Sequence, residues 1–204
     1  MPAANRGRPR GTSGKAAVLS PTQVRNVLRV ARARQRLAPR SAAAFALSVG
    51  LGLRAKELAA LRWSDAFEDG GAPRDVLHLK AAYTKGDKTR DVYLSSPRLR
   101  RVLGEYHARC RPWDLGAPLF RSQKGGHLTP ASMARFLKQL YREAGLPDAS
   151  SHSGRRTLIT RLAERGVDLK AISAIAGHAS VRTTAMYVED NPARLSRILE
   201  EVPL

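Results

Sequence analysis

The sequence predicts a mixed α+β fold that is mainly α-helical and carries one small antiparallel β-sheet. Apolar residues recur at helical spacing through most of the chain, whereas the alternation typical of strands is confined to residues 75–95. The chain has 204 residues, of which 43% are hydrophobic, and this is enough for one compact domain with a tail.

Helical segments fill the first third of the predicted domain. The first is expected to begin at Pro21, with Ser20 as its N-cap, and to run to about Arg36. A second apolar segment covers 42–53, and a further helical pattern covers 54–63, with glycines between the two. We therefore expect a buried helix, a turn and another helix.

A hairpin is expected next. Val76 and His78 alternate with Leu77, and the same alternation recurs after Asp91. The intervening residues 84–89 are basic and contain a glycine, as in a hairpin turn.

The rest of the chain returns to helical spacing. One stretch follows Ser95 and another follows Thr129. A last helix over 194–202 has an apolar stripe, which fits either packing in the core or docking on a neighbouring copy. Three short helices are expected between these, over 155–165, 169–176 and 181–187.

Net charge indicates the kind of partner. Thirty-six Lys and Arg face 17 Asp and Glu, which gives a formal charge of +19 and favours nucleic acid. A basic membrane-surface protein is the rival class, but no apolar run is long enough to span a bilayer. We expect a soluble, cytoplasmic protein, and the single cysteine, Cys110, excludes an internal disulfide framework.

Residues 1–18 are expected to form a flexible basic arm, and residues 19–204 the folded domain. Within the arm, Arg6, Arg8 and Arg10 lie in a Gly-Pro context that resembles an AT-hook, which places arginines in narrow minor grooves. The alternative is a solvated tail with generic affinity for phosphates, and both interpretations stay open.

Three separated motifs carry the chemical signal. They are Gly52-Leu-Arg-Ala-Lys-Glu57, the hairpin segment Thr84-Lys-Gly-Asp-Lys-Thr-Arg90, and a C-terminal set made of His152-Ser-Gly-Arg155, Gly177-His178 and Thr183-Thr-Ala-Met-Tyr187. In order and spacing they resemble the active-site boxes of tyrosine recombinases of the phage integrase class, over about residues 20–204.

The resemblance implies the catalytic-domain fold of that family, covalent DNA cleavage through a 3′-phosphotyrosyl intermediate, and no cofactor or metal. It also implies a role for each matching position. Arg54 and Arg155 would be the paired arginines, Lys85 the hairpin lysine, His152 and His178 the histidines, Glu57 the acidic partner and Tyr187 the nucleophile. We further expect Lys88, Arg90 and Arg156 to contact DNA, with Lys88 as the competitor of Lys85.

Phosphodiester chemistry favours the same residue types. Attack on the anionic phosphate builds charge on its oxygens, and arginine forks bind such oxygens while staying protonated. A tyrosine hydroxyl has an ordinary pKa near 10, so it needs a base or a strongly positive pocket. A lysine on a hairpin turn can protonate the departing 5′ oxygen. No His-x-x-x-His or carboxylate cluster supports a metal-dependent nuclease.

Two departures from the family pattern lie beside the second arginine. Gly154 stands where leucine is usual, and Arg156 where histidine is frequent. The DNA-embracing domain that usually precedes the catalytic domain is also expected to be missing. Grip on DNA would then depend on the basic arm, a partner or an accessory DNA-bending protein, and exchange would take place in a tetramer. The rival function is a DNA-binding relative that no longer recombines.

Overall fold

A computed structural model describes residues 16–83, 89–110, 114–122, 125–187 and 200, apart from the side chain of Arg36. In chain order the elements are α1 (Pro21–Arg32), the 3-10 turn η1 (Gln35–Leu37), α2 (Ala38–Gly50), α3 (Ala55–Ala60), α4 (Trp63–Ala66), β1 (Val76–Leu79), η2 (Ala81–Tyr83), β2 (Arg90–Tyr93), α5 (Pro97–Cys110), α6 (Pro130–Glu143), α7 (Ser153–Glu164), α8 (Leu169–Ala176) and α9 (Val181–Ala185). This mainly helical architecture with one small sheet agrees with the predicted fold class.

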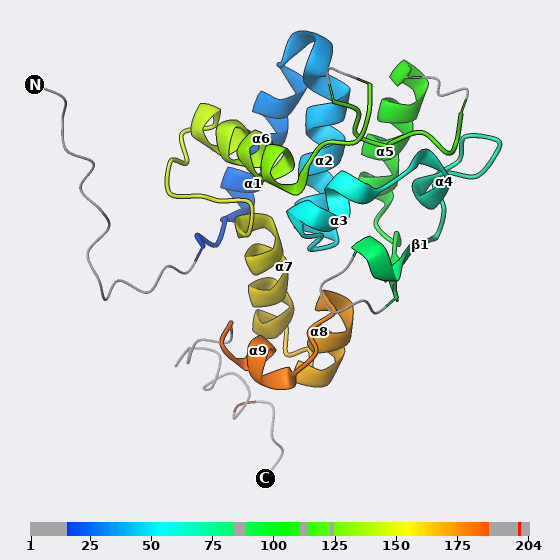
Figure 1. Cartoon of the computed structure of the whole chain (residues 1–204). Coiled ribbons are helices and arrows are strands. Elements are labelled where there is room, and N and C mark those ends of the chain that lie inside the picture. Colours follow the sequence, from blue (N-terminus) through cyan, green and yellow to red (C-terminus); the bar gives the residue numbers. More distant parts are fainter. Residues whose placement is uncertain (1–15, 84–88, 111–113, 123–124, 188–199, 201–204) are drawn as a thin grey trace, which may run out of the picture.

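Helix α2 is the centre of the main body. Residues Ser41–Ser48 are all buried, because α1, α5 and α7 pack around this helix. Helix α7 leads from the main body to α8 and α9, which lie at one end of the molecule (Figure 1). A second, smaller apolar cluster forms there around Ile159 and Ile172. The fold therefore has a large body and a small α7–α9 lobe that share α7.

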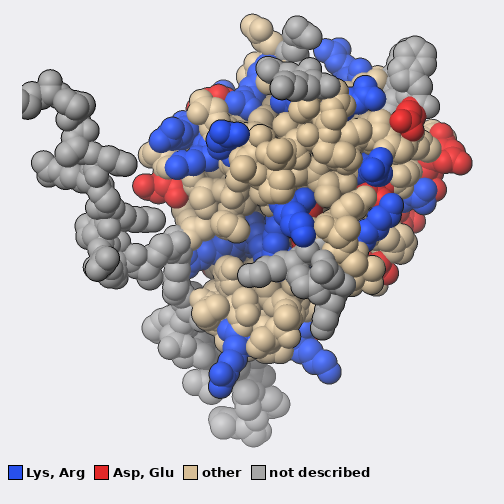
Figure 2. All heavy atoms as spheres, in the orientation of Figure 1, with Lys and Arg blue, Asp and Glu red and all other residues tan. Residues whose placement is uncertain are grey.

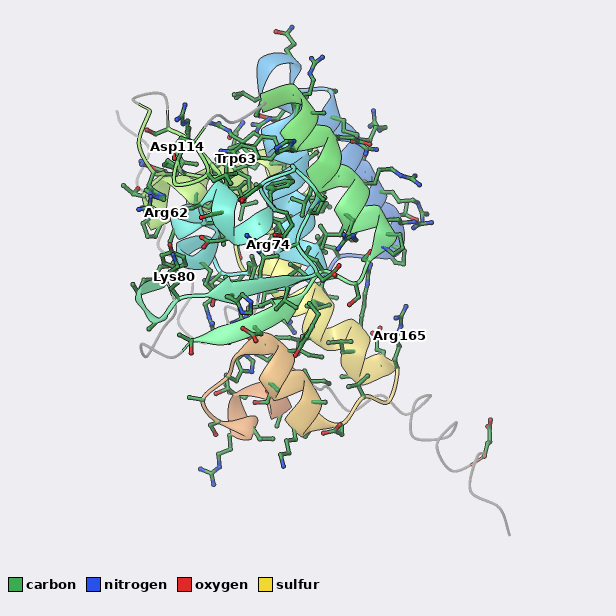
Figure 3. The ribbon with its side chains drawn as sticks, turned by 90° about the vertical axis from the view of Figure 1, so that its right-hand side faces the viewer. Arg62, Trp63, Arg74, Lys80, Asp114 and Arg165 are labelled. Carbon is green, nitrogen blue, oxygen red and sulfur yellow. The ribbon has the colours of Figure 1, made fainter. Side chains whose placement is uncertain are left out.

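The predicted hairpin is present as the two strands β1 and β2. They pair antiparallel with Leu77 opposite Val92, and both of these side chains are buried. The strands lie between the main body and α8–α9, with Lys80 at one end (Figure 3). The turn that connects them, residues 84–88, lies outside the described residues. The sheet thus lies at the junction of the two parts.

The structure corrects several predicted helix boundaries. Helix α1 ends at Arg32 rather than Arg36, and Gln35 follows with a φ of 47°, at which an α-helix cannot continue. The helix expected over 54–63 is broken at Leu61, whose carbonyl accepts from the amide of Leu119 at 2.8 Å. Helix α2 starts four residues before the expected 42, at Ala38.

Both ends of the chain lie partly outside the described residues. Residues 1–15, which include the suggested AT-hook, are not described. Nearly all of the helix expected over 194–202 also lies outside the described residues. Residues 16–19 lie along α7, where Thr157 Oγ1 accepts from the amide of Leu19 at 2.9 Å. None of the described helices is long and apolar enough to cross a membrane.

Gly154 fits a close approach between α7 and α2. A Cβ at this position would lie 3.0 Å from the carbonyl carbon and oxygen of Ser48, which are backbone atoms that cannot move aside. We expect Gly154→Ala to lower the free energy of unfolding by about 1–3 kcal/mol, as overpacking does. Gly104→Ala is the control, since a Cβ there meets nothing within 4 Å in α5, and it should be stabilising. Chemical denaturation measures both, and an unchanged midpoint for Gly154→Ala would contradict this packing.

Candidate active site

Three arginines meet the C-terminal end of α8. The last carbonyls of a helix lack partners within the helix and carry the negative end of its dipole, so they attract cations. Here three successive carbonyls each accept from a different arginine. The distances are 2.6 Å from Arg90 Nη1 to the Ile175 oxygen, 2.5 Å from Arg155 Nη2 to the Ala176 oxygen, and 3.2 Å from Arg54 Nη2 to the Gly177 oxygen. Arginines far apart in sequence are thereby brought to one point.

The carboxylate of Glu57 forms ion pairs with two of these arginines, Arg54 and Arg90. Its side chain is fully buried, and Oε1 accepts from Arg54 Nη1 at 2.9 Å. Oε2 accepts from the backbone amide of Arg54 at 2.7 Å and from Arg90 Nη2 at 2.9 Å. Both carboxylate oxygens are therefore bonded, and Glu57 fixes the two guanidinium groups in relation to each other.

Arg155 is the most enclosed of the three arginines, with 3% of its surface exposed. Its Nη1 donates to the Gly52 carbonyl at 2.9 Å, which ties α7 to the turn before α3. Burial, together with the nearby charge of Arg54, lowers the pKa of Arg155 to about 10. Arg155 is thus still protonated at neutral pH and poised to bind an anion.

Glycines form the two turns that the arginines contact. Gly177 has a φ of 63°, in the left-handed region, and ends α8 as a C-cap. A Cβ on Gly177 would lie 2.5 Å from Arg90 Cδ. Gly52 also has a left-handed φ of 65°, and a Cβ there would lie 3.0 Å from Leu158. Glycine at these positions lets the chain turn while the arginines pack closely against it.

His178 follows directly on the α8 C-cap. Its Nδ1 lies 2.8 Å from the hydroxyl oxygen of Thr184, a fully buried residue in α9. Burial, together with the nearby charges of Arg155, Arg54 and Arg90, lowers the pKa of His178 to about 4. His178 is therefore neutral at pH 7. When Nδ1 donates its proton to Thr184, the lone pair on Nε2 can accept a proton.

Tyr187 lies against His178 just after α9. The two rings stack with centroids 5.6 Å apart and planes inclined by 20°. Tyr187 also packs on the small apolar cluster of the α7–α9 lobe, and its phenol is close enough to Arg155 to act on the pKa of that residue. The structure thus brings five of the predicted residues into one pocket, namely Arg54, Glu57, Arg155, His178 and Tyr187.

Of the other predicted site residues, Arg90 joins the pocket, His152 and Arg156 make none of the contacts described above, and the rest lie outside the described ranges. His152 is exposed at the start of α7, and within the described part of the chain its ring makes no hydrogen bond. Arg156 donates from Nη1 to the Ala16 carbonyl at 2.8 Å. Five further basic residues are outside the described residues, namely Arg6, Arg8, Arg10, Lys85 and Lys88.

Two further residues contribute to the pocket, one without a predicted role and one with a different predicted role. Thr184 orients His178, and the only signal for it is its place in the Thr-Thr-x-x-Tyr pattern. Arg90 is expected there to contact DNA, yet its guanidinium lies inside the pocket with 11% of the side chain exposed. Because Glu57 lies 33 positions earlier in the chain, local sequence could not reveal this pairing.

Positive charge gathers on the molecular surface where the pocket lies. Lys and Arg side chains cluster in the hollow between the main body and the α7–α9 lobe (Figure 2). The hollow shows almost no acidic side chains in this view, whereas acidic residues gather at the outer edges of the main body (Figure 2). A hollow of this kind attracts a polyanion.

Comparison with known proteins identifies the family. The model described as "Phage integrase family" matches residues 17–194, which is most of the chain. The chain belongs to the phage integrase family. Among its relatives, tyrosine recombinase XerC of Brucella suis biovar 1 (strain 1330) is 38% identical over 168 residues, which are 81% of this chain and 51% of that protein. XerC of Methylobacterium sp. (strain 4-46) is 40% identical over 164 residues, 79% of this chain and 49% of that protein.

Solved structures of family members share the fold. The crystal structure of XerA recombinase superposes with a TM-score of 0.72 at 23% identity, covering 97% of this chain and 68% of XerA. A post-cleavage complex of XerH gives a TM-score of 0.71 at 24% identity, covering 90% of this chain and 52% of XerH. The chain spans about half the length of the curated relatives it matches.

Proposed function

We propose that this chain is the catalytic domain of a site-specific DNA recombinase that cleaves and rejoins strands through Tyr187. The observation that carries the proposal is the convergence of Arg54 and Arg155 on the pocket in which Tyr187 stacks on a neutral His178. Such a pocket binds a phosphate and places a nucleophile and a base beside it.

In the cleavage step, the Tyr187 oxygen attacks the phosphorus and the bond from phosphorus to the 5′ oxygen breaks. The product is a 3′-phosphotyrosyl linkage and a free 5′ hydroxyl. The phenolic proton passes to His178, which is neutral and adjacent, whereas His152 is exposed at the start of α7. The departing 5′ oxygen takes a proton from Lys85, the hairpin lysine by position in the family motif.

Rejoining is the reverse of cleavage. A 5′ hydroxyl gives its proton to Lys85 and attacks the phosphotyrosyl phosphorus, and the departing Tyr187 oxygen recovers its proton from His178. The phosphodiester energy is held in the tyrosyl bond, so no nucleotide is hydrolysed. If the attacking hydroxyl belongs to another duplex, the strands are exchanged, with integration, excision or inversion as the outcome.

Relatives suggest the partners. The XerH structures hold difH substrates, and a lambda integrase structure is a dimer bound to a core site. We propose double-stranded DNA as the substrate, a tetramer as the assembly that exchanges strands, and the cytoplasm as the place of action. Arg156, Lys88 and the arm with Arg6, Arg8 and Arg10 would contact DNA outside the pocket. Residues 19–204 would form the catalytic domain.

A suicide substrate tests this function. A library of nicked duplexes, whose cleavage releases a short strand that diffuses away, should leave the wild-type protein covalently attached to DNA. We expect Tyr187→Phe to form no adduct, because phenylalanine has no attacking oxygen, and denaturing gel electrophoresis reads this out. Tyr93→Phe is the control, since Tyr93 is 65% exposed on β2. An adduct that persists in Tyr187→Phe would refute the assignment, and DNA binding without any wild-type adduct would indicate a non-recombining relative.

A further inference from the structure

We propose that Arg90 is the third arginine of the catalytic pocket, a positioning residue that acts on Arg54 through Glu57 and on His178 through the end of α8. The inference rests on the proposed function and gives Arg90 a role different from the direct DNA contact that its position in the hairpin motif suggests. It is carried by contacts among described residues of β2, α3 and α8.

The bonds of Arg90 point inward. Nη2 is 2.9 Å from Glu57 Oε2, and Nη1 is 2.6 Å from the Ile175 carbonyl. Its Nε is also buried and has no hydrogen-bond partner among the described residues. To reach a DNA phosphate at the surface, this side chain would have to give up a buried ion pair, which is costly. The guanidinium is therefore built into the protein.

Arg90 is coupled to Arg54 by one carboxylate. Glu57 receives Arg54 on Oε1 and Arg90 on Oε2, so the position of each guanidinium depends on the other. Without Arg90, Oε2 keeps the backbone amide of Arg54 as its partner, and the carboxylate is free to rotate toward Arg54. A small displacement of Arg54, which would hold the reacting phosphate, is therefore expected to slow the reaction strongly.

Arg90 is coupled to His178 through the α8 C-cap. Its Cδ packs where a side chain at position 177 would be, and its Nη1 holds the carbonyl two residues before that position. The turn at Gly177 sets the direction of His178, the next residue. Arg90 thus supports from one side the turn that Arg54 and Arg155 hold from the others.

Charge gives Arg90 a second effect on the same pocket. The pocket holds three guanidinium groups and one carboxylate, Glu57, which bonds two of them, so two positive charges are left uncompensated among these side chains. A phosphodiester attacked by a phenolate carries two negative charges in the transition state, and a pocket with two spare positive charges is matched to it. Removal of Arg90 leaves only one uncompensated positive charge in the pocket.

The proton equilibrium of His178 reports this charge separately from packing. The groups that face His178 are Arg155 from α7, Arg54 beside α3, Arg90 from β2 and Tyr187 after α9, with Glu57 behind the arginines. Positive neighbours disfavour a second positive charge, so loss of Arg90 raises the pKa of His178 toward its ordinary value. If cleavage needs neutral His178, the acid limb of the pH–rate profile then moves to higher pH.

The experiment compares Arg90→Met, Arg90→Lys and a matched control, Arg100→Met. Arg100 makes the same kinds of contact outside the pocket, with Nη1 2.5 Å from Asp75 Oδ1 and Nη2 2.9 Å from the Pro73 carbonyl. Single-turnover adduct formation on the suicide substrate is followed from about pH 3.5 to 8, a range that includes the pKa of His178. DNA affinity is measured separately in a Tyr187→Phe background, and thermal melting checks that each variant is folded.

We expect Arg90→Met to slow adduct formation about 100-fold with DNA affinity changed less than about threefold, and to shift the acid limb upward. Arg90→Lys should lose about tenfold in rate but keep the wild-type acid limb, because lysine keeps the charge and only one of the two bonds. This variant carries the test if Arg90→Met does not fold.

Two results would overturn the proposal. One is an equal loss of affinity and rate in the Arg90 variants, which would make Arg90 a direct DNA contact. The other is a rate like that of Arg100→Met. Failure of the proposed function is seen differently, because the wild-type protein itself would then form no adduct.

Discussion

Replacement of Glu57 by glutamine is expected to lower the free energy of unfolding by about 3–5 kcal/mol, as the loss of one partner from a buried ion pair does. The carboxylate is fully buried between Arg54 and Arg90. The neutral amide of glutamine cannot balance the two arginine charges. Its NH₂ group would also put a donor against an arginine N–H, where the carboxylate has an accepting oxygen. Equilibrium unfolding in urea measures the change.

The matched control for this variant is Glu105→Gln. Glu105 is 48% exposed and pairs with Arg32 at 2.8 Å, so solvent screens the interaction. Its loss should change the free energy of unfolding by less than about 1 kcal/mol. Equal stability losses for Glu57→Gln and Glu105→Gln would show that the buried carboxylate does not organise the pocket.

Replacement of Arg155 by lysine is expected to slow single-turnover adduct formation by about 100- to 1,000-fold. An arginine has five N–H donors, and here the carbonyls of Gly52 and Ala176 occupy two of them, which leaves three for a phosphate. A lysine at this position keeps the charge but cannot bridge both carbonyls and also bind a phosphate in a fork.

Arg161→Lys is the control for this variant, because Arg161 lies on the same helix and donates to the Leu19 carbonyl at 3.1 Å. It should leave the adduct rate unchanged. The suicide substrate used for Tyr187→Phe measures both rates. A rate for Arg155→Lys within threefold of the wild type would remove Arg155 from the phosphate clamp.

Local sequence predicted most of the secondary structure because the signals were local. Ser20 caps α1 with its side chain, and Thr129 caps α6 in the same way. The hairpin alternation placed Leu77 and Val92 on the buried face. Helix α8 has the bounds expected from its apolar spacing and the glycine that follows it. In each case the deciding residues are within a few positions of one another.

The features that local sequence did not predict depend on partners distant in the chain. The break at Leu61 is made by backbone pairing with residues near 119, which no pattern around Leu61 reveals. The inward position of Arg90 needs Glu57 and α8, which lie on separate elements. Gly154, where leucine is usual in the family, lies close to the backbone of Ser48 on α2. The order of motifs indicated which residues meet, but not which side chains support them.

The identity of the residue joined to DNA is the most direct test of this account. Trypsin releases Tyr187 in the peptide Thr183–Arg194, separate from the other four tyrosines of the chain. The trapped adduct should be digested with nuclease and trypsin and examined by mass spectrometry. We predict a nucleotide phosphate on Tyr187 in that peptide. A nucleotide found on any other residue would contradict the pocket described for Arg54, Arg155 and Tyr187.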